Sequence, residues 1–303
     1  MLDLHMHSLY SDDGEFTPAQ LVEQCSAQGI IVMSITDHNS IRANSEAERL
    51  AAEHGICYIP GIEIDCMFEG VGFHVLGYGI NYHSDDFMRI EKNVEKQTID
   101  ASAKLLQKTQ ELGFPITEED VFAVSRTAHR PEIWTGEIFA EVLLGKPEFA
   151  EHPLLAPYRP GGSRSDNPFV NFYWDYYSQG KPCHVRIEYP PMEEVIDIIH
   201  KNGGIAVLAH PGVNLKGREH LLKPLLELPF DGIEAFSSYH TVQQAEYYHG
   251  AAAFRNILTT CGSDYHGKTK TSVHLGGYAT IAGIDLSQIE KVVLAMTGNL
   301  SNQ

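Results

Sequence analysis

The chain has 303 residues and a formal net charge of -18, which leaves room for one α/β barrel of roughly 200 to 250 residues with an insertion and excludes a basic surface for duplex nucleic acid. Its five cysteines are odd in number and include no Cys-x-x-Cys pair, which argues against a disulfide framework and a thiolate zinc site. No apolar run approaches the roughly 20 residues that span a bilayer, so we expect a cytoplasmic protein with neither signal peptide nor membrane contact.

Short apolar runs, each followed by polar residues, recur along the chain. Amphipathic stretches of helical spacing, such as 17–29 and 40–55, lie between several of them. This alternation predicts a parallel sheet, and about seven such units predict a closed or nearly closed barrel. The runs are LDLHMH (2–7), IIVMSITDH (30–38), ICYIPGIEID (56–65), GFHVLGYG (72–79), GGIAVLAHP (203–211), DGIEAFSS (231–238) and NILTTCGSDYH (256–266).

Residues 83–182 interrupt this alternation, because they contain no clear buried strand. They show a long charged helical pattern, two shorter helical patterns, a loop rich in Pro, Gly, Arg and Ser, and an aromatic segment. We therefore predict a mainly helical subdomain at 83–182 that caps the active site, inserted into a barrel formed by 1–82 and 183–303.

Potential metal ligands gather at the predicted strand ends, where the loops of an α/β barrel converge on the active site. Any one of them is weak evidence, and His74 alone would more often be a core histidine. Their convergence on six of seven candidate strands favours a metal centre, and imidazole with carboxylate suits Zn²⁺, Mn²⁺ or Fe²⁺ better than Mg²⁺ or Ca²⁺. The candidates are His5, His7, Asp12, His38, Glu63, His74, His210, Asp264 and His266.

These motifs resemble those of a known family. HMH with a downstream SDD, TDH (36–38), GIE (61–63), AHP (209–211) and GSDYH (262–266) are similar, in this order, to the motifs of the PHP (polymerase and histidinol phosphatase) metal-dependent phosphoesterases. The resemblance implies a distorted (β/α)₇ barrel, a small domain inserted between the fourth and fifth strands, and three divalent metal ions.

The resemblance also implies which residues share a metal. Asp37 is expected to orient a neighbouring ligand rather than to bind metal. One metal would take His5, His7, Glu63 and Asp264; a second would share Glu63 with His74 and His210; the third would take Asp12, His38 and His266.

Basic residues near the predicted insertion are candidates for binding phosphate, since Arg and Lys supply fixed positive charge. They are Arg130, Lys181, His184 and Arg186; the alternative is that they are exposed charges at helix ends. Arg130 matches an arginine-proline motif of the family, usually GRPH, but His129 and Glu132 replace its glycine and histidine. This departure leaves the identity of the substrate open.

Other side chains carry weaker hypotheses. His240 is a candidate general acid, or a loop histidine without a role. The aromatic side chains at 172–174, 176 and 177 could stack on a nucleobase, but are more typical of a subdomain core. Arg159 and Arg164 belong to a loop that is either a lid or irregular surface.

We expect hydrolysis of a small phosphorylated metabolite by metal-activated hydroxide attack on phosphorus. A nucleoside 3′,5′-bisphosphate or a similar phosphomonoester is the first candidate. The alternatives are a cyclic sugar or nucleotide phosphate, 5′-phosphorylated RNA ends, a non-catalytic PHP module, and amidohydrolase chemistry at carbon, in which a lysine would usually stand in the bridging place of Glu63. The sequence leaves the oligomeric state open.

Overall fold

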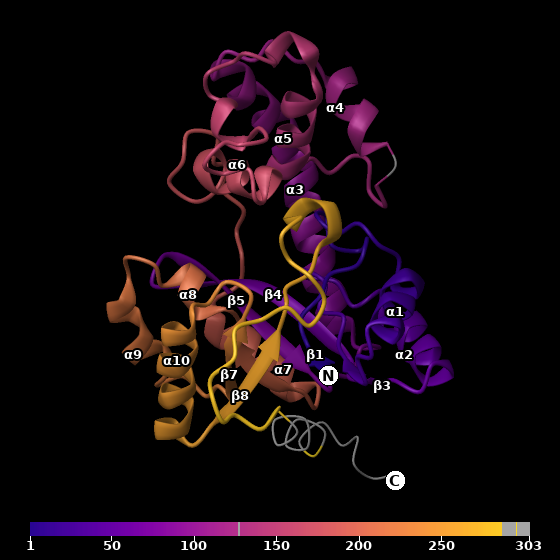
Figure 1. The fold of residues 1–303 in the computed structure, drawn as a ribbon, viewed down its shortest axis with the longest axis vertical. Coiled ribbons are helices and arrows are strands. Elements are labelled where there is room, and N and C mark those ends of the chain that lie inside the picture. Colours follow the sequence, from indigo (N-terminus) through magenta and orange to yellow (C-terminus); the bar gives the residue numbers. More distant parts are fainter. Residues whose placement is uncertain (127, 287–294, 296–303) are drawn as a thin grey trace.

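The computed structural model describes residues 1–126, 128–286 and 295, and its strands form two sheets. A parallel sheet has the order β1-β2-β3, and a mixed sheet has the order β4-β5-β6-β7-β8 (Figure 1). The strands are β1 (Leu2–Asp3), β2 (Val32–Met33), β3 (Cys57–Tyr58), β4 (Gly61–Phe68), β5 (Val71–Tyr78), β6 (Ile205–Leu208), β7 (Gly232–Ser237) and β8 (Leu258–Gly262).

This topology does not confirm the predicted (β/α)₇ barrel. Among the described residues no strand ladder joins the two sheets. They meet through isolated bridges, His38 with Glu63 on one side and Met6 with Tyr265 on the other, and through backbone hydrogen bonds such as that from Leu4 N–H to the carbonyl oxygen of Cys261 (3.2 Å). The run 56–65 divides into β3 and the start of β4. In addition, β4 and β5 form an antiparallel hairpin with no helix between them, because Glu69 and Gly70 have positive φ (48° and 78°) and complete a two-residue turn.

Helices flank the sheets as the sequence predicts. The predicted start of the first helix is confirmed, because Thr17 caps it reciprocally with Gln20, and Gly29 follows its end with φ 71°. In Figure 1, α1 and α2 lie beside the parallel sheet, and α8 to α10 lie beside β7. The bounds are α1 (Pro18–Ala27), α2 (Asn44–Glu53), α7 (Met192–Lys201), α8 (Pro211–Asn214), α9 (Leu222–Leu225) and α10 (Val242–Arg255).

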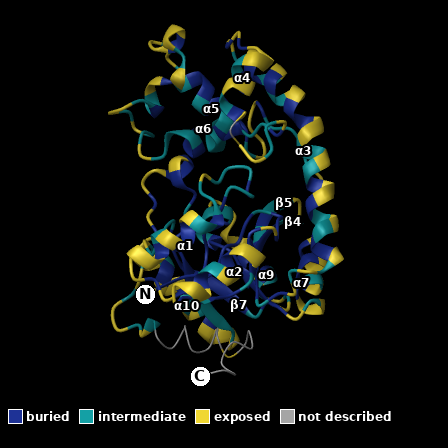
Figure 2. Cartoon of the chain, turned by 90° about the vertical axis from the view of Figure 1, so that its right-hand side faces the viewer, coloured by how far each residue is buried: buried dark blue, intermediate teal, exposed yellow. Residues whose placement is uncertain are grey.

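The segment predicted as an insertion contains helices and, among its described residues, no strand. It forms a helical lobe above the sheets in Figure 1, and Figure 2 shows α3 running along the side of both parts. The lobe has its own apolar core, which includes Phe114, Phe139 and Phe172. Its main helices are α3 (Asp85–Glu111), α4 (Glu118–Ser125), α5 (Gly136–Gly145) and α6 (Pro168–Tyr176), with short 3₁₀ turns at Pro147–Phe149 and Ala156–Tyr158.

The helical lobe is fastened to the segment that follows β8. This segment begins with a 3₁₀ turn at Gly267–Lys270. The Lys268 ammonium lies 2.7 Å from a Glu141 carboxylate oxygen, the Thr271 hydroxyl donates to the carbonyl oxygen of Asp166 (2.7 Å), and the backbone N–H of Ser272 donates to Asn167 Oδ1 (2.8 Å). These contacts hold the lobe over the strand ends.

No helix within the described residues combines the length and the apolar character needed to cross a membrane. No disulfide joins the five cysteines, all of which lie in the described part of the chain.

β8 approaches the start of the chain so closely that only glycine fits at Gly262. A Cβ atom there would meet the Cβ of His5, and it would lie 2.7 Å from the His5 backbone nitrogen and 2.9 Å from Glu234 Oε1. The approach matters because it brings the loop after β8 beside the loop after β1.

We predict that Gly262→Ala lowers the free energy of unfolding of the metal-free protein by about 1 to 3 kcal/mol, the usual cost of overpacking. Chemical denaturation measures this change. Gly250→Ala is the matched control, because a Cβ there meets nothing within 4 Å and alanine favours the α10 helix. If Gly262→Ala were as stable as the natural protein, the close packing would be refuted.

Candidate metal centre

Four groups of His, Asp and Glu side chains converge where the two sheets meet. Within each group the potential ligand atoms all lie within 4.8 Å of one another. The groups contain every predicted ligand except Asp12. They are His5, His7, Glu63 and Asp264; Glu63, His74 and His210; His7, Asp13, His38 and His266; and His38, Asp65 and His74.

Asp13 occupies the place predicted for Asp12. Asp13 Oδ2 lies 3.2 Å from Nε2 of His266, whereas Asp12 Oδ1 lies 2.7 Å from an Arg130 guanidinium nitrogen. The loop turns at this point, with backbone hydrogen bonds from Ser11 to Ser8 and from Gly14 to Ser11. The two consecutive carboxylates therefore have different partners, and sequence spacing alone could not choose between them.

His5 and His7 are both held by their Nδ1 atoms. Nδ1 of His5 lies 2.9 Å from Glu234 Oε1, and Nδ1 of His7 lies 2.9 Å from the Ser11 hydroxyl. Their Nε2 atoms face each other at 3.1 Å. Burial lowers the pKa of His7 to about 3, with the neighbouring His266 and His38 adding to the effect. Burial alone would lower the pKa of His5, but the surrounding carboxylates, that of Glu234 first, outweigh burial and hold this pKa well above its ordinary value. Two Nε2 atoms that converge in this way fit a shared cation, whose binding would displace the proton from His5.

Glu63 lies between two of the groups. Its Oε2 is 3.0 Å from His5 Nε2 and its Oε1 is 3.0 Å from His210 Nε2. Burial alone would raise the pKa of this carboxyl, but the surrounding imidazoles, that of His5 first, outweigh burial and hold the pKa well below its ordinary value. An ionised, fully buried carboxylate in this position fits the bridging ligand that the family resemblance implies.

Several buried polar atoms at the site form no hydrogen bond with the described residues, although three of them lie 3.0 to 3.3 Å from an oppositely charged or ionisable side chain. Buried polar groups in folded proteins are nearly always paired, so these atoms need an explanation. A bound cation would satisfy them, and the nitrogen and oxygen donors present suit Zn²⁺, Mn²⁺ or Fe²⁺. The atoms are Asp13 Oδ1, His38 Nδ1, Asp264 Oδ1 and His266 Nε2.

Two buried ionisable side chains that the sequence analysis missed orient these candidate ligands. Glu234 binds His5 through Oε1, and its Oε2 accepts the backbone N–H of His210 (2.9 Å). The Lys270 ammonium lies 2.6 Å from Asp264 Oδ2 and leaves Oδ1 toward the histidines. An acidic residue within the buried run GIEAFS was a signal for Glu234, whereas no local pattern marked Lys270.

Asp37 lies outside the four groups and contacts the loop after β1 instead. Its Oδ2 accepts the Ser8 hydroxyl at 2.6 Å, and its Oδ1 accepts the Ser11 hydroxyl at 3.2 Å. Asp37 thus fixes the loop that carries Asp12 and Asp13.

The structure does not support His240 as a general acid. The ring donates through Nδ1 to the carbonyl oxygen of Ala235 (2.8 Å), and its Nε2 accepts the backbone N–H of Gly212 (3.0 Å). Burial also lowers the pKa of His240, which disfavours the protonated form that a general acid needs. Both ring nitrogens are already engaged in holding the loop after β6 against β7.

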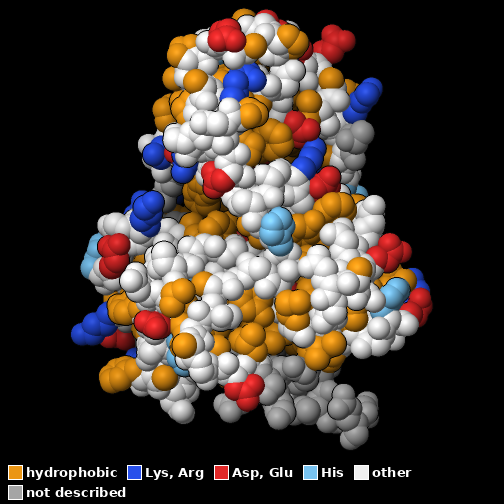
Figure 3. Space-filling model, in the orientation of Figure 1, with side chains coloured by type: hydrophobic (Ala, Val, Ile, Leu, Met, Phe, Trp, Pro, Cys, Tyr) orange, Lys and Arg blue, Asp and Glu red, His pale blue; other side chains and the backbone are white. Residues whose placement is uncertain are grey.

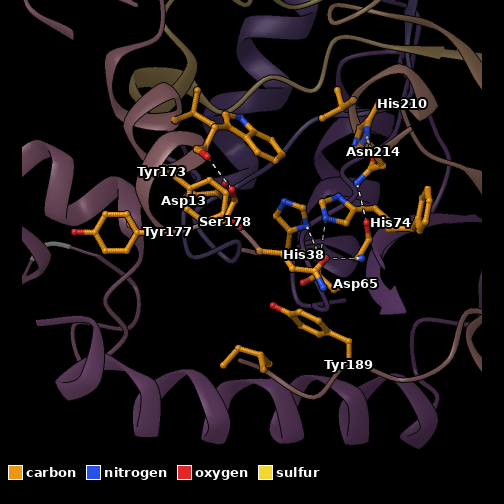
Figure 4. Close-up of a pocket in the computed structure, with 18 of the residues that line it drawn as sticks. Asp13, His38, Asp65, His74, Tyr173, Tyr177, Ser178, Tyr189, His210 and Asn214 are labelled. Carbon is orange, nitrogen blue, oxygen red and sulfur yellow. Dashed lines mark hydrogen bonds and ion pairs between the residues drawn. The ribbon is translucent and has the colours of Figure 1, made fainter. Parts of the chain in front are cut away.

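A cavity of about 1490 Å³ opens between the helical lobe and the sheets, with metal-ligand candidates on its floor. In Figure 4, His38, His74 and Asp65 face one another, with Tyr189 nearby. All four predicted substrate-binding residues line this cavity: Arg130, Lys181, His184 and Arg186. Figure 3 shows Lys and Arg side chains beside the narrow part of the molecule, where the lobe joins the sheets.

The aromatic segment divides between core and cavity. Phe172 is fully buried in the core of the lobe, and Tyr176 packs against that core. Tyr177 belongs to the core and also reaches the cavity, whereas Tyr173 and Trp174 line the cavity wall. The core interpretation is therefore correct only for part of the segment.

Arg159 and Arg164 are fixed within the lobe. Arg164 makes two hydrogen bonds of 3.1 Å to the Asp175 carboxylate, and Arg159 donates to the carbonyl oxygens of Leu144 and Phe149. The loop that carries them is thus tied to neighbouring helices.

The sequence of this chain is similar to those of several known proteins. The model of the PHP domain matches residues 3–116. A phosphoribosyl 1,2-cyclic phosphate 1,2-diphosphodiesterase of Eggerthella lenta is 28% identical, covering 90% of this chain and 97% of the relative. A 5′-3′ exoribonuclease of Haemophilus influenzae is 27% identical (87% and 89%), and a 3′,5′-nucleoside bisphosphate phosphatase of Chromobacterium violaceum is 24% identical (88% and 87%).

Solved structures show the same fold. A candidate metal-dependent phosphoesterase of Bifidobacterium adolescentis superposes with a TM-score of 0.76 and 25% identity, covering 97% of this chain and 96% of the other. A protein of Chromobacterium violaceum, named as an amidohydrolase, superposes with a TM-score of 0.77 and 22% identity over 96% of each chain. The chain is therefore similar in sequence to the PHP domain at residues 3–116, and its fold is similar to these solved structures along nearly its whole length.

Proposed function

We propose that the protein is a metal-dependent phosphoesterase that holds three divalent cations, manganese, iron or zinc, at its strand ends. The observation that carries this proposal is the pair of side-chain groups that share the Glu63 carboxylate, with the group around Asp13 and His266 beside them. When bound, closely spaced cations lower the pKa of water toward neutrality and neutralise the oxygens of a phosphate ester.

The residues of the chain hold and orient the reactants. His5, His7 and Asp264 would bind the first cation with Glu63, which also serves the second cation with His74 and His210. The third would be held by Asp13, His38 and His266, and not by Asp12. Glu234 and Lys270 keep their ligands in one orientation, which preorganises the centre. A water oxygen would form a bond to phosphorus while the bond between phosphorus and the ester oxygen breaks, and a proton released by the water would leave with the alcohol.

Arg130 would bind the phosphate. It is the most buried of the predicted substrate-binding cations, since its side chain is 9% exposed and that of Arg186 is 77% exposed. A guanidinium offers several donors to phosphate oxygens. Lys181, His184 and Arg186, at the rim of the same cavity, would bind a second anionic group.

A nucleoside 3′,5′-bisphosphate is the substrate that we favour, because Arg130 and, farther out, Lys181 and Arg186 line the same cavity and could bind two separate phosphate groups. The relative from Chromobacterium violaceum is a phosphatase of this substrate. A cyclic phosphate is the second candidate, supported by the relative from Eggerthella lenta. The cavity also exceeds the roughly 300 to 1,000 Å³ of common small-molecule pockets, which favours short 5′-phosphorylated RNA as the third.

The substrate is tested by phosphate release from the manganese-loaded protein. We expect faster turnover of adenosine 3′,5′-bisphosphate than of a five-membered cyclic ribose phosphate or a short 5′-phosphorylated RNA. Preference for the cyclic ester or for RNA would replace the favoured substrate. Inertness of a sample with three bound metals toward a broad phosphate-ester panel would refute phosphoesterase activity.

We predict that Asp264→Ala loses metal and turnover while the fold stays intact, because this carboxylate faces both histidines of the first motif at 3.0 to 3.2 Å. Elemental analysis and phosphate release measure the two effects, and circular dichroism checks the fold. Asp100→Ala, an exposed position on α3, is the control. Full activity of Asp264→Ala would rule out the assigned role.

We predict that Arg130→Ala raises KM about ten-fold or more, the effect of losing a hydrogen bond between charged groups. If Arg130 grips the phosphate more tightly in the transition state, kcat falls as well. Steady-state kinetics at constant metal content measure both. Arg126→Ala, exposed at the end of α4, should behave like the natural protein, and an unchanged KM for Arg130→Ala would exclude phosphate binding.

A further inference from the structure

The surroundings of Arg130 suggest a role for Asp12, the carboxylate that does not join the metal-ligand groups. Arg130 lies in the loop between α4 and α5, and its Nη2 atom binds Asp12 Oδ1 at 2.7 Å. The same Nη2 donates to the carbonyl oxygen of Tyr10 at 3.2 Å. Two contacts from the loop after β1 therefore fix the guanidinium of the helical lobe.

Asp12 and Asp13 link two different parts of the site. Asp13 approaches His266 among the candidate metal ligands, while Asp12 holds the cation from the lobe. Their Cα atoms are joined by one peptide unit, about 3.8 Å long. The position of Arg130 relative to the metal-ligand groups is thus set by adjacent residues of one loop, which the Asp37 carboxylate fixes in turn.

The guanidinium keeps donors for a ligand. An arginine side chain has five N–H donors, and the hydrogen bonds of Arg130 within the described residues use only Nη2. Glu95 Oε1 lies 3.9 Å from Nη1, beyond hydrogen-bonding distance. Both Arg130 and Asp12 line the cavity. Nη1 and Nε therefore remain available to oxygens of a phosphate group.

We propose that Asp12 is a positioning residue, which holds Arg130 in the orientation that binds the substrate phosphate. This inference rests on the proposed function. A long, flexible arginine that is already fixed loses less freedom when the substrate binds. Because the phosphate would use the other donors, it need not displace Asp12, and the carboxylate assists binding rather than competing with it.

The test is a double-mutant cycle with Asp12→Asn and Arg130→Ala, together with Asp13→Asn as the matched neighbour. Metal content, KM and kcat are measured for each manganese-loaded variant with the best substrate of the natural protein. We expect Asp12→Asn to keep the full metal content and to raise KM about ten-fold. In the Arg130→Ala background the same change should have no further effect. Asp13→Asn should instead lose metal.

Binding of inorganic phosphate to the metal-loaded protein, followed by calorimetry, gives a readout that needs no turnover. Asp12→Asn should weaken this binding in the natural background and leave it unchanged beside Arg130→Ala. Arg130→Lys, whose ammonium cannot reproduce the planar fork, should weaken it in a similar way and serves if Asp12→Asn fails to fold.

Three outcomes would overturn the proposal. Loss of metal in Asp12→Asn would make Asp12 a ligand. An unchanged KM and phosphate affinity, or penalties that multiply in the double variant, would show that Asp12 does not act through Arg130. If the natural protein bound phosphate but hydrolysed no ester, the proposed function would fail while the role of Asp12 would still be decided by the binding cycle.

Discussion

The site depends on one buried carboxylate, that of Glu63. Its two oxygens approach imidazoles from the start of the chain, from the loop after β2, from β5 and from the loop after β6. A charge this deeply buried is stable only when opposite charge or hydrogen bonds surround it. The convergence of the surrounding side chains on Glu63 therefore satisfies a demand of folding, and it also builds the arrangement that would hold cations.

The order and direction of the strands bring these side chains close to Glu63. Because β5 returns directly along β4, His74 lies opposite Asp65 in the register of the hairpin and beside Glu63. The bridges of His38 to Glu63 and of Met6 to Tyr265 bring the two sheets together at the same place. The helical lobe, fastened through Lys268 and Glu141, then covers the strand ends and supplies Arg130 to the cavity. The same contacts thus build both the centre and its binding wall.

The differences between the predicted site and the arrangement in the structure have physical causes. Asp12 and Asp13 are chemically identical neighbours, and only the turn of their loop gives one to Arg130 and the other to His266. His240 follows a strand end, as a catalytic residue would, but both of its ring nitrogens bind backbone groups. An acidic residue within an apolar run could mark Glu234 but not its partner, which is distant in sequence, and no local pattern marked Lys270.

The sequence by itself determined the features whose information is local: the chemical type of the candidate ligands, their places after apolar runs, the capped helices and the interval of helical patterns without a strand. Only the tertiary structure decided which ligands share Glu63, which aspartate faces the centre, and that the strands form two sheets joined by isolated bridges and backbone hydrogen bonds. These features depend on contacts between segments far apart in the chain, and such contacts form only when packing fixes the direction of each side chain.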